Sequence, residues 1–211
     1  MRRTTVLLAA AAVLVAGAGH AATAAPAPKP QKKTFYLHGS TPFGNLDRNP
    51  VDAGTPLAMD TKKPTGTQDK YYGTYGAVAS PNSQCAGSPF YPGWSAPLGG
   101  KLVGKATVTF WAVSSGGNAK VQLFNDVTES ACNEAYPGPI GEATVALPSG
   151  PSPQKVTVTF PVSSKLKVVS TLLLQIQSGA GPELEAVVYD STASPASLSI
   201  TCLPKTGKKA C

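Results

Sequence analysis

Hydrophobic and polar residues alternate with a period of two in many short segments of this chain. In residues 105–113, for example, Ala106, Val108 and Phe110 alternate with Thr and Trp side chains. Such alternation is typical of a β-strand with one buried face, and no segment shows a sustained helical period. Further strands are predicted at residues 118–126, 142–147, 155–162, 170–177, 184–190 and 196–202.

The number and spacing of these segments predict the fold class. Clusters of Gly, Pro, Asn, Asp and Ser separate them, and this pattern favours an all-β fold, a two-sheet antiparallel β-sandwich. The N-terminal third is less regular. Strands are predicted there at residues 34–38 and 55–59, while residues 60–97, rich in Gly, Pro and Tyr, are expected to form long loops.

The first two dozen residues have the pattern of a secretory signal peptide. Arg2 and Arg3 precede an apolar run, and small residues follow it, so we expect cleavage after Ala24, with Ala21 as second choice. The apolar run is shorter than the roughly 20 residues that span a bilayer. The predicted organisation is a signal peptide at 1–24, a Pro- and Lys-rich linker at 25–33, a β-sandwich domain at 34–204 and a basic tail at 205–211, the linker and tail being disordered. The expected location is extracellular, either free or associated with the cell wall, with no transmembrane segment.

The formal charge of +7 does not indicate a nucleic-acid partner, because the excess lies at the two ends of the chain. Between Thr34 and Pro204 there are ten Lys and Arg residues against eleven Asp and Glu residues, a net charge of −1. The predicted domain is therefore close to neutral. Its basic ends are either solvated or contact anionic surfaces.

Four cysteines in an exported chain predict two disulfides. They are Cys85, Cys132, Cys202 and Cys211, and they permit three pairings. We favour Cys85–Cys132 with Cys202–Cys211, because the second bridge would hold a polar chain end. A metal site is the weaker alternative, since no C-x-x-C spacing is present.

Candidate catalytic residues are few. His38 is the single histidine after the expected cleavage point, and a histidine at the end of a strand is more often structural than catalytic. A hydrolase would have to use the loop carboxylates Asp47, Asp52, Asp60 and Asp69, which could also bind Ca²⁺. Neither a glycosidase spacing nor a calcium-loop motif accompanies them, so we expect no catalytic residue, no bound metal and no cofactor.

Aromatic residues of the loop-rich region are the candidate ligand-binding residues. Exposed Tyr and Trp rings stack on sugars or anchor protein interfaces, while their polar atoms stay hydrated. The alternative is that these rings fill the ends of the sandwich; Trp111, within a regular strand, is expected to pack. The candidates are Tyr71, Tyr72, Tyr75, Tyr91 and Trp94, with Phe90 beside them.

One short motif lies near the end of the chain. Residues Leu203 to Gly207 match the L-P-x-T-G pentapeptide that sortases cleave. Sortase substrates continue with an apolar membrane-spanning stretch, whereas only Lys208-Lys209-Ala210-Cys211 follows here. We interpret the match as chance.

Several segments resemble a known group of proteins. Tyr36-Leu37-His38-Gly39, Leu57-Ala58-Met59-Asp60, Gln84-Cys85-Ala86-Gly87 and the strand from Leu102 resemble the uncharacterised secreted β-sandwich proteins of high-GC Gram-positive bacteria. The later strands are similar to jelly-roll, galactose-binding-like modules of secreted peptidases. The resemblance implies a module that binds glycans, stabilises a neighbouring domain or has no known activity.

Together these observations predict a secreted, non-catalytic binding or structural module. Its partner would be a cell-surface glycan or another extracellular protein. The alternatives are a carbohydrate-binding module that uses the loop aromatics, and a secreted hydrolase that uses the loop carboxylates.

Overall fold

The computed structural model describes residues 27–39, 57–73, 93–125, 139–162, 169–178, 184–205, 208 and 211. Strands dominate these residues, and they contain no helix. The strands in chain order are β1 (Gln31–Leu37), β2 (Leu57–Asp60), β3 (Lys70–Gly73), β4 (Gly93–Ser114), β5 (Asn118–Asn125), β6 (Gly141–Ala146), β7 (Gly150–Pro161), β8 (Val169–Ser178), β9 (Leu184–Tyr189) and β10 (Ser197–Pro204).

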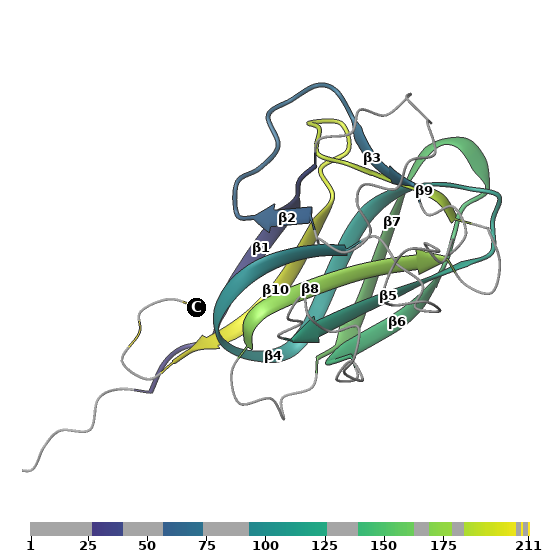
Figure 1. Cartoon of the computed structure of the whole chain (residues 1–211). Helices are drawn as coiled ribbons and strands as arrows, with labels where there is room; N and C mark the ends of the chain where they lie inside the picture. Colours follow the sequence, from purple (N-terminus) through teal and green to yellow (C-terminus); the bar gives the residue numbers. More distant parts are fainter. Residues whose placement is uncertain are drawn as a thin grey trace, which may run out of the picture.

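The strands form two layers that share the long strand β4 (Figure 1). The first half of β4 pairs with β8, which continues through β5 to β6, and the second half lies between β10 and β7. β1 pairs with β10, and β2 joins β1 to the first half of β4. β9 pairs with the end of β4, and β3 pairs with β9.

The predicted all-β, jelly-roll-type sandwich is confirmed as the fold class, with one difference in its construction. The layers are not separate sheets, because β4 passes from one to the other and keeps its hydrogen-bond partners in both. A register shift between Ser199 and Thr201 of β10 accompanies this change. Gly104 in the same part of β4 has φ of +75°, a backbone conformation that favours glycine.

The core lies between the layers and follows the predicted alternation. Ala106, Val108 and Phe110 of β4 are buried against Val158 and Phe160 of β7 and against apolar residues of the other layer. Thr side chains of the same two strands point outward and are more exposed. Burying each large apolar side chain stabilises the fold by about 1.5–3 kcal/mol relative to leaving it exposed.

Several strands differ from the sequence-based prediction. β1 begins at Gln31, inside the expected linker, because residues 31–33 pair with β10. β3 was missed since it is a four-residue strand with a single partner, β9. The first half of β4 was expected to be loop because of its Gly and Pro content, yet Trp94, Ala96 and Leu98 alternate into the core.

No helix in the described part of the chain is long and apolar enough to cross a membrane. The expected signal peptide and its cleavage site lie outside the described residues.

Candidate functional site

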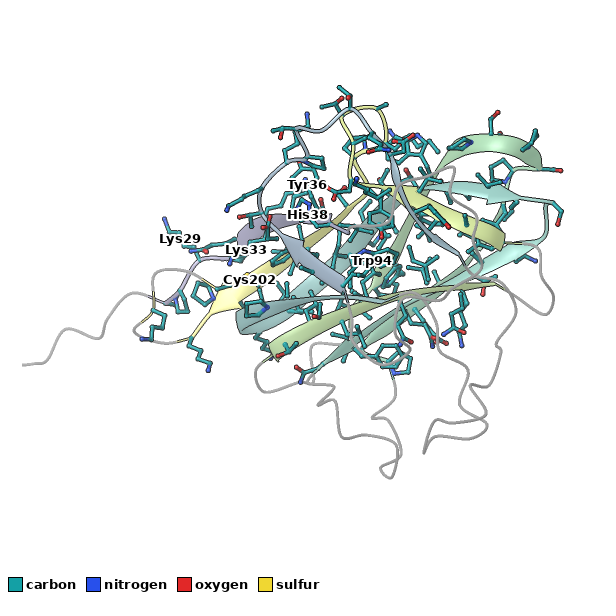
Figure 2. The ribbon with its side chains drawn as sticks, turned by 45° about the horizontal axis from the view of Figure 1, so that its top comes forward. Lys29, Lys33, Tyr36, His38, Trp94 and Cys202 are labelled. Atoms are coloured by element: carbon teal, nitrogen blue, oxygen red, sulfur yellow. A yellow bond between two sulfur atoms is a disulfide. The ribbon has the colours of Figure 1, made fainter. Side chains whose placement is uncertain are left out.

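The aromatic candidates do not form an exposed platform where the structure describes them. Trp94, labelled in Figure 2, is 0% exposed. Its ring meets the ring of Tyr189 edge to face, with 5.1 Å between ring centroids. Tyr71 is 6% exposed and packs beside Trp111 in a small cluster. These two rings therefore contribute to packing and leave little surface for a ligand.

The remaining aromatic candidates are less informative. Tyr72 lies in β3 opposite Val187, and Tyr75, Phe90 and Tyr91 lie outside the described residues. Trp111 was expected to pack. It is half-buried, and the Lys155 ammonium lies 5.8 Å from the centroid of its ring.

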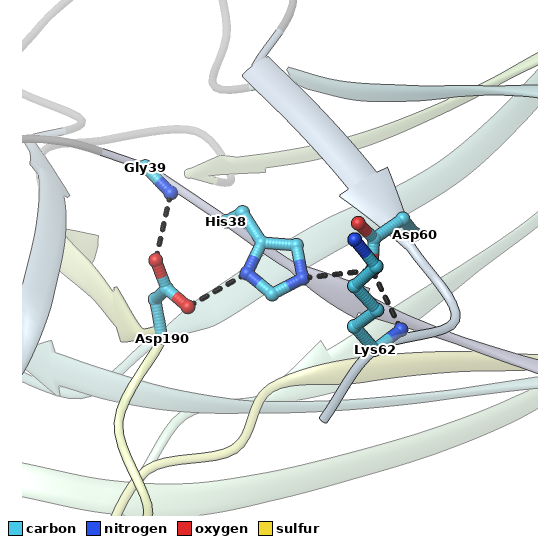
Figure 3. A network of polar contacts seen from close by, with 5 residues as sticks. All are labelled: His38, Gly39, Asp60, Lys62 and Asp190. Atoms are coloured by element: carbon cyan, nitrogen blue, oxygen red, sulfur yellow. Dashed lines mark hydrogen bonds and ion pairs between the residues drawn. The ribbon is translucent and has the colours of Figure 1, made fainter. Parts of the chain in front are cut away.

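His38, the residue after β1, is held between two carboxylates (Figure 3). Its Nδ1 lies 2.7 Å from Asp190 Oδ1, and its Nε2 lies 3.2 Å from Asp60 Oδ1. Because carboxylates only accept hydrogen bonds, a ring nitrogen that bonds to one does so as an N–H donor. A general base needs a free lone pair on one of the two ring nitrogens. In this arrangement His38 works as a clamp between two chain segments.

Asp190 adopts an unusual backbone conformation at this clamp. Its φ of 62° lies in the left-handed region, which Asp tolerates better than most residues. Its Oδ2 also accepts a hydrogen bond of 3.1 Å from the Gly39 N–H. A Cβ on Gly39 would lie 2.3 Å from the Tyr189 hydroxyl, so this close approach requires glycine. The clamp thus fixes the chain after β9 against the end of β1.

Asp60 has a pKa below its ordinary value, chiefly because the Lys62 backbone N–H donates a hydrogen bond of 2.6 Å to its Oδ1. Charge attraction and hydrogen bonding from His38 lower this pKa further. A lowered pKa in the folded state means that Asp60 stabilises the fold above the unfolded pKa and loses that contribution as the pH falls through the folded pKa. The effect is small, because Asp60 is 49% exposed.

The carboxylates proposed for hydrolysis or Ca²⁺ binding are engaged with the protein where they are described. Asp60 belongs to the His38 clamp, and Asp69 accepts a hydrogen bond from the Ser191 hydroxyl. Asp47 and Asp52 lie outside the described residues. Among the described residues, no group of three His, Cys, Asp or Glu side chains could hold a metal ion.

We predict that changing Asp190 alters stability in a graded way. Asp190→Ala removes both acceptors and leaves Cβ in a left-handed backbone, so we expect a loss of about 3 kcal/mol in the free energy of unfolding. Asp190→Asn tolerates the backbone and still accepts from Gly39, so its loss is expected to be about 1–2 kcal/mol. Urea unfolding checks both values. Unchanged midpoints for both variants would show that the clamp contributes nothing to stability.

The expected Cys202–Cys211 disulfide is confirmed, while Cys85 and Cys132 lie outside the described residues. Cys202 is buried in β10, and the Lys33 ammonium donates a hydrogen bond to the main-chain oxygen of Cys211. Figure 2 shows Lys29, Lys33 and Cys202 at the same end of the molecule. The chain is therefore held at Cys211, the last residue of the expected basic tail.

The sortase-like pentapeptide begins inside β10. Leu203 pairs with Lys101 and Pro204 pairs with Gly100, so the first two of its five residues belong to the sheet. These two residues are therefore held in the sheet and do not form a separate extended segment.

The most regular polar surface is the outer side of the layer that contains β1, β10, β4 and β7. Directly paired residues share a face of a sheet, and the registers of these strands place hydroxyl side chains in two adjoining rows. We call this surface the hydroxyl face. Its rows are Thr159, Thr107, Ser199 and Thr34, and next to them Thr157, Thr109, Ser197 and Tyr36.

The hydroxyls of this face are ordered by bonds to one another. The hydrogen-bonded pairs are Thr107–Thr159 at 2.9 Å, Thr109–Thr157 at 3.2 Å and Thr34–Ser199 at 2.9 Å. Each hydroxyl has one donor and two acceptor positions, so a bonded pair retains one donor and three acceptor positions for other partners. The face therefore offers a regular set of hydrogen-bonding groups, about 4.8 Å apart between strands and about 7 Å apart along them.

The outer side of the opposite layer is polar too, but its groups satisfy one another. Gln122 is buried; it donates to Glu142 Oε2 at 2.7 Å and accepts from the Gln177 amide. Lys120 forms an ion pair of 3.0 Å with the same Glu142 oxygen. The bond from Lys120 and, to a lesser degree, the bond from Gln122 lower the pKa of Glu142. This network holds three strands together and leaves fewer free groups than the hydroxyl face.

The hydroxyl face could not be identified from strand patterns alone. Thr107, Thr109, Thr157 and Thr159 are visible in the sequence as the polar positions of two strands. Their alignment depends on the register between strands that are about fifty residues apart in the chain, which the sequence does not state. The sequence feature that could have indicated this face is the repetition of Thr at alternating positions of the two strands.

Comparisons with known proteins give fold likeness only. No family model matches the chain, and no curated protein matches its sequence. An aminopeptidase from the marine sediment archaeon Thaumarchaeota archaeon superposes with a TM-score of 0.50 and 12% identity, over 81% of this chain and 36% of that one. A CocE/NonD family hydrolase from Staphylococcus aureus gives a TM-score of 0.49 and 11% identity, over 83% of this chain and 37% of that one. A solved structure described as "CBM4 structure and function" gives a TM-score of 0.37 and 14% identity, over 64% of this chain and 76% of that one. The chain thus spans little more than a third of the two enzymes.

Proposed function

We propose that this protein is a secreted, non-catalytic binding module that recognises a polysaccharide through the hydroxyl face. The observation that carries the proposal is the pair of aligned hydroxyl rows across four strands. A polysaccharide presents donors and acceptors at regular intervals, which a regular set of protein hydroxyls can match. Rigid strands hold such groups in place, so little conformational entropy is lost on binding.

The non-catalytic part of the proposal rests on the state of the candidate catalytic groups. Both ring nitrogens of His38 are engaged by carboxylates, and Asp69 is engaged by Ser191. Catalysis by a Ser-His-Asp arrangement would require one of those nitrogens to face a nucleophile. Secretion is supported by the signal-like N-terminal sequence and by the disulfide between Cys202 and Cys211.

The test removes two hydroxyls while keeping the shape of the side chains. Thr109→Val/Thr157→Val deletes both members of one hydrogen-bonded pair, and such a paired replacement is nearly neutral for folding. We expect wild-type protein to sediment with at least one of chitin, cellulose, xylan or purified bacterial cell walls. The double variant should bind that material about tenfold more weakly, since about 1.4 kcal/mol of hydrogen bonding is lost.

Thr144→Val is the matched control, because Thr144 is an exposed strand residue on the other layer. Its binding should equal that of the wild type. Folded wild-type protein that binds neither these four materials nor any acidic polysaccharide, or equal binding by the Thr109→Val/Thr157→Val variant, would contradict the proposal.

A further inference from the structure

Lysine side chains frame the hydroxyl face at both ends. Lys105 pairs with Pro161 beyond one end of the rows, and Lys155 pairs with Trp111 beyond the other. Lys32 of β1 pairs with Thr201, two positions outside the Thr34–Ser199 pair. All three lysines are exposed. Pro161, the partner of Lys105, lies six positions after Lys155 in β7, so Lys105 and Lys155 lie about 20 Å apart along the strands.

These positive charges are not neutralised by the described part of the protein. None of the ion pairs found among the described residues involves Lys32, Lys105 or Lys155. Asp60 lies opposite Tyr36 at the edge of the face, but it is occupied by His38 and by the Lys62 N–H. The positions between the lysines carry uncharged hydroxyls, so the face has a net positive charge.

The opposite layer provides the comparison within the same molecule. There Lys120 is paired with Glu142, and the amides around it are bonded to one another. A lysine whose charge served only solubility would need no particular placement. Three lysines that form no ion pair with the described residues surround hydroxyls that retain donor and acceptor positions, and together they complement a ligand that is both hydroxylated and anionic.

We propose that the ligand of the hydroxyl face is an acidic polysaccharide, in which the protein hydroxyls bind the sugar hydroxyls and the lysines bind the anionic groups. This inference rests on the proposed function and specifies its substrate class. The anionic group is a carboxylate, as in a uronate, or a phosphate attached to the glycan. Lysine binds either one as a compact, hydrated point charge.

The experiment compares four probes by isothermal titration at low and high salt. They are polygalacturonate, a glycerol-phosphate teichoic acid, a neutral galactan and inorganic polyphosphate. We expect at least tenfold tighter binding to one of the two acidic glycans than to the galactan, and weaker binding as salt rises. The preferred acidic glycan identifies the anionic group.

Two charge variants make the test specific. Lys105→Gln/Lys155→Gln should weaken binding to the acidic glycan about fivefold to tenfold and leave any binding to the galactan unchanged. Lys63→Gln/Lys208→Gln changes the net charge equally at two other exposed lysines and should behave like the wild type.

The outcomes separate this inference from the proposed function. Equal binding to galactan and acidic glycans, without salt dependence, overturns the acidic ligand but retains the polysaccharide-binding face. Equal binding to polyphosphate and acidic glycans, with no effect of Thr109→Val/Thr157→Val, shows charge attraction alone and overturns both. No effect of Lys105→Gln/Lys155→Gln on binding to the acidic glycan also overturns the inference.

Discussion

Replacing Trp94 by Ala should destabilise this protein by about 3–5 kcal/mol, the usual cost of removing a buried Trp or Phe side chain. Trp94 is completely buried in the first half of β4, where it pairs with Leu57 of β2 and Leu174 of β8. Its ring also packs edge to face against Tyr189. The substitution therefore leaves a large cavity where three strands and both layers meet.

The expected measurement is a lower denaturant midpoint with little change in the slope of the transition. Trp94→Phe retains an aromatic ring in contact with Tyr189 and should cost less, about 1–2 kcal/mol. Trp111→Ala is the matched control, because Trp111 is half-buried on an outer face and should also cost less than Trp94→Ala.

This prediction also decides between two roles for Trp94. If Trp94→Ala keeps the wild-type midpoint and loses polysaccharide binding, the aromatic-platform hypothesis holds for this residue and its assignment to the core is wrong. If the midpoint falls as expected, any loss of binding must be measured under conditions in which the variant is folded. Binding per folded molecule should then equal that of the wild type.

Sequence patterns predicted the fold well wherever one face of a strand is buried. Val156, Val158 and Phe160 alternate with Thr, and the same residues are buried in β7. The alternation arises because successive side chains of a strand point to opposite faces, and it needs no knowledge of the neighbouring strands. The pairing partners and the passage of β4 between layers depend on contacts distant in sequence, so they could not be predicted in this way.

The candidate site was harder to predict, because the local sequence around an aromatic residue does not show whether its ring is exposed or buried. Trp94 lies in a Gly- and Pro-rich segment that is typical of a loop, yet it alternates into the core with Ala96 and Leu98. Conversely, Thr109 and Thr157 are ordinary outward-facing strand residues by themselves. They become part of a candidate surface only through the register of β4 and β7.

His38 illustrates a partial success. Its position at the end of a strand was correctly predicted, and a structural role was favoured there. Its partners were not identified, because Asp190 is 152 residues away in the chain. Asp60 was noted only as one of several loop carboxylates.

Removing the Cys202–Cys211 disulfide should destabilise the protein by about 2–3 kcal/mol, the loss that the chain-entropy model gives for a short closed loop. The bridge closes a loop of sequence separation 9 at the end of β10. Cys211→Ser removes the bridge and leaves the buried Cys202 side chain in place, so no core cavity is added. A Cβ on Gly100 would lie 2.8 Å from Cys211 Sγ, which shows how closely the bridge packs against β4.

Two measurements check this prediction, and both use the intact chain. The urea midpoint of Cys211→Ser should fall, and the wild type treated with a reductant should fall to a similar value. Limited trypsin digestion after the exposed Lys205 should leave the C-terminal fragment attached in the unreduced wild type and release it from Cys211→Ser. Release from both proteins without reductant would show that the bridge does not form. Retention of the fragment in the unreduced wild type, together with an unchanged urea midpoint for Cys211→Ser, would show that the bridge forms but would contradict the predicted stabilisation.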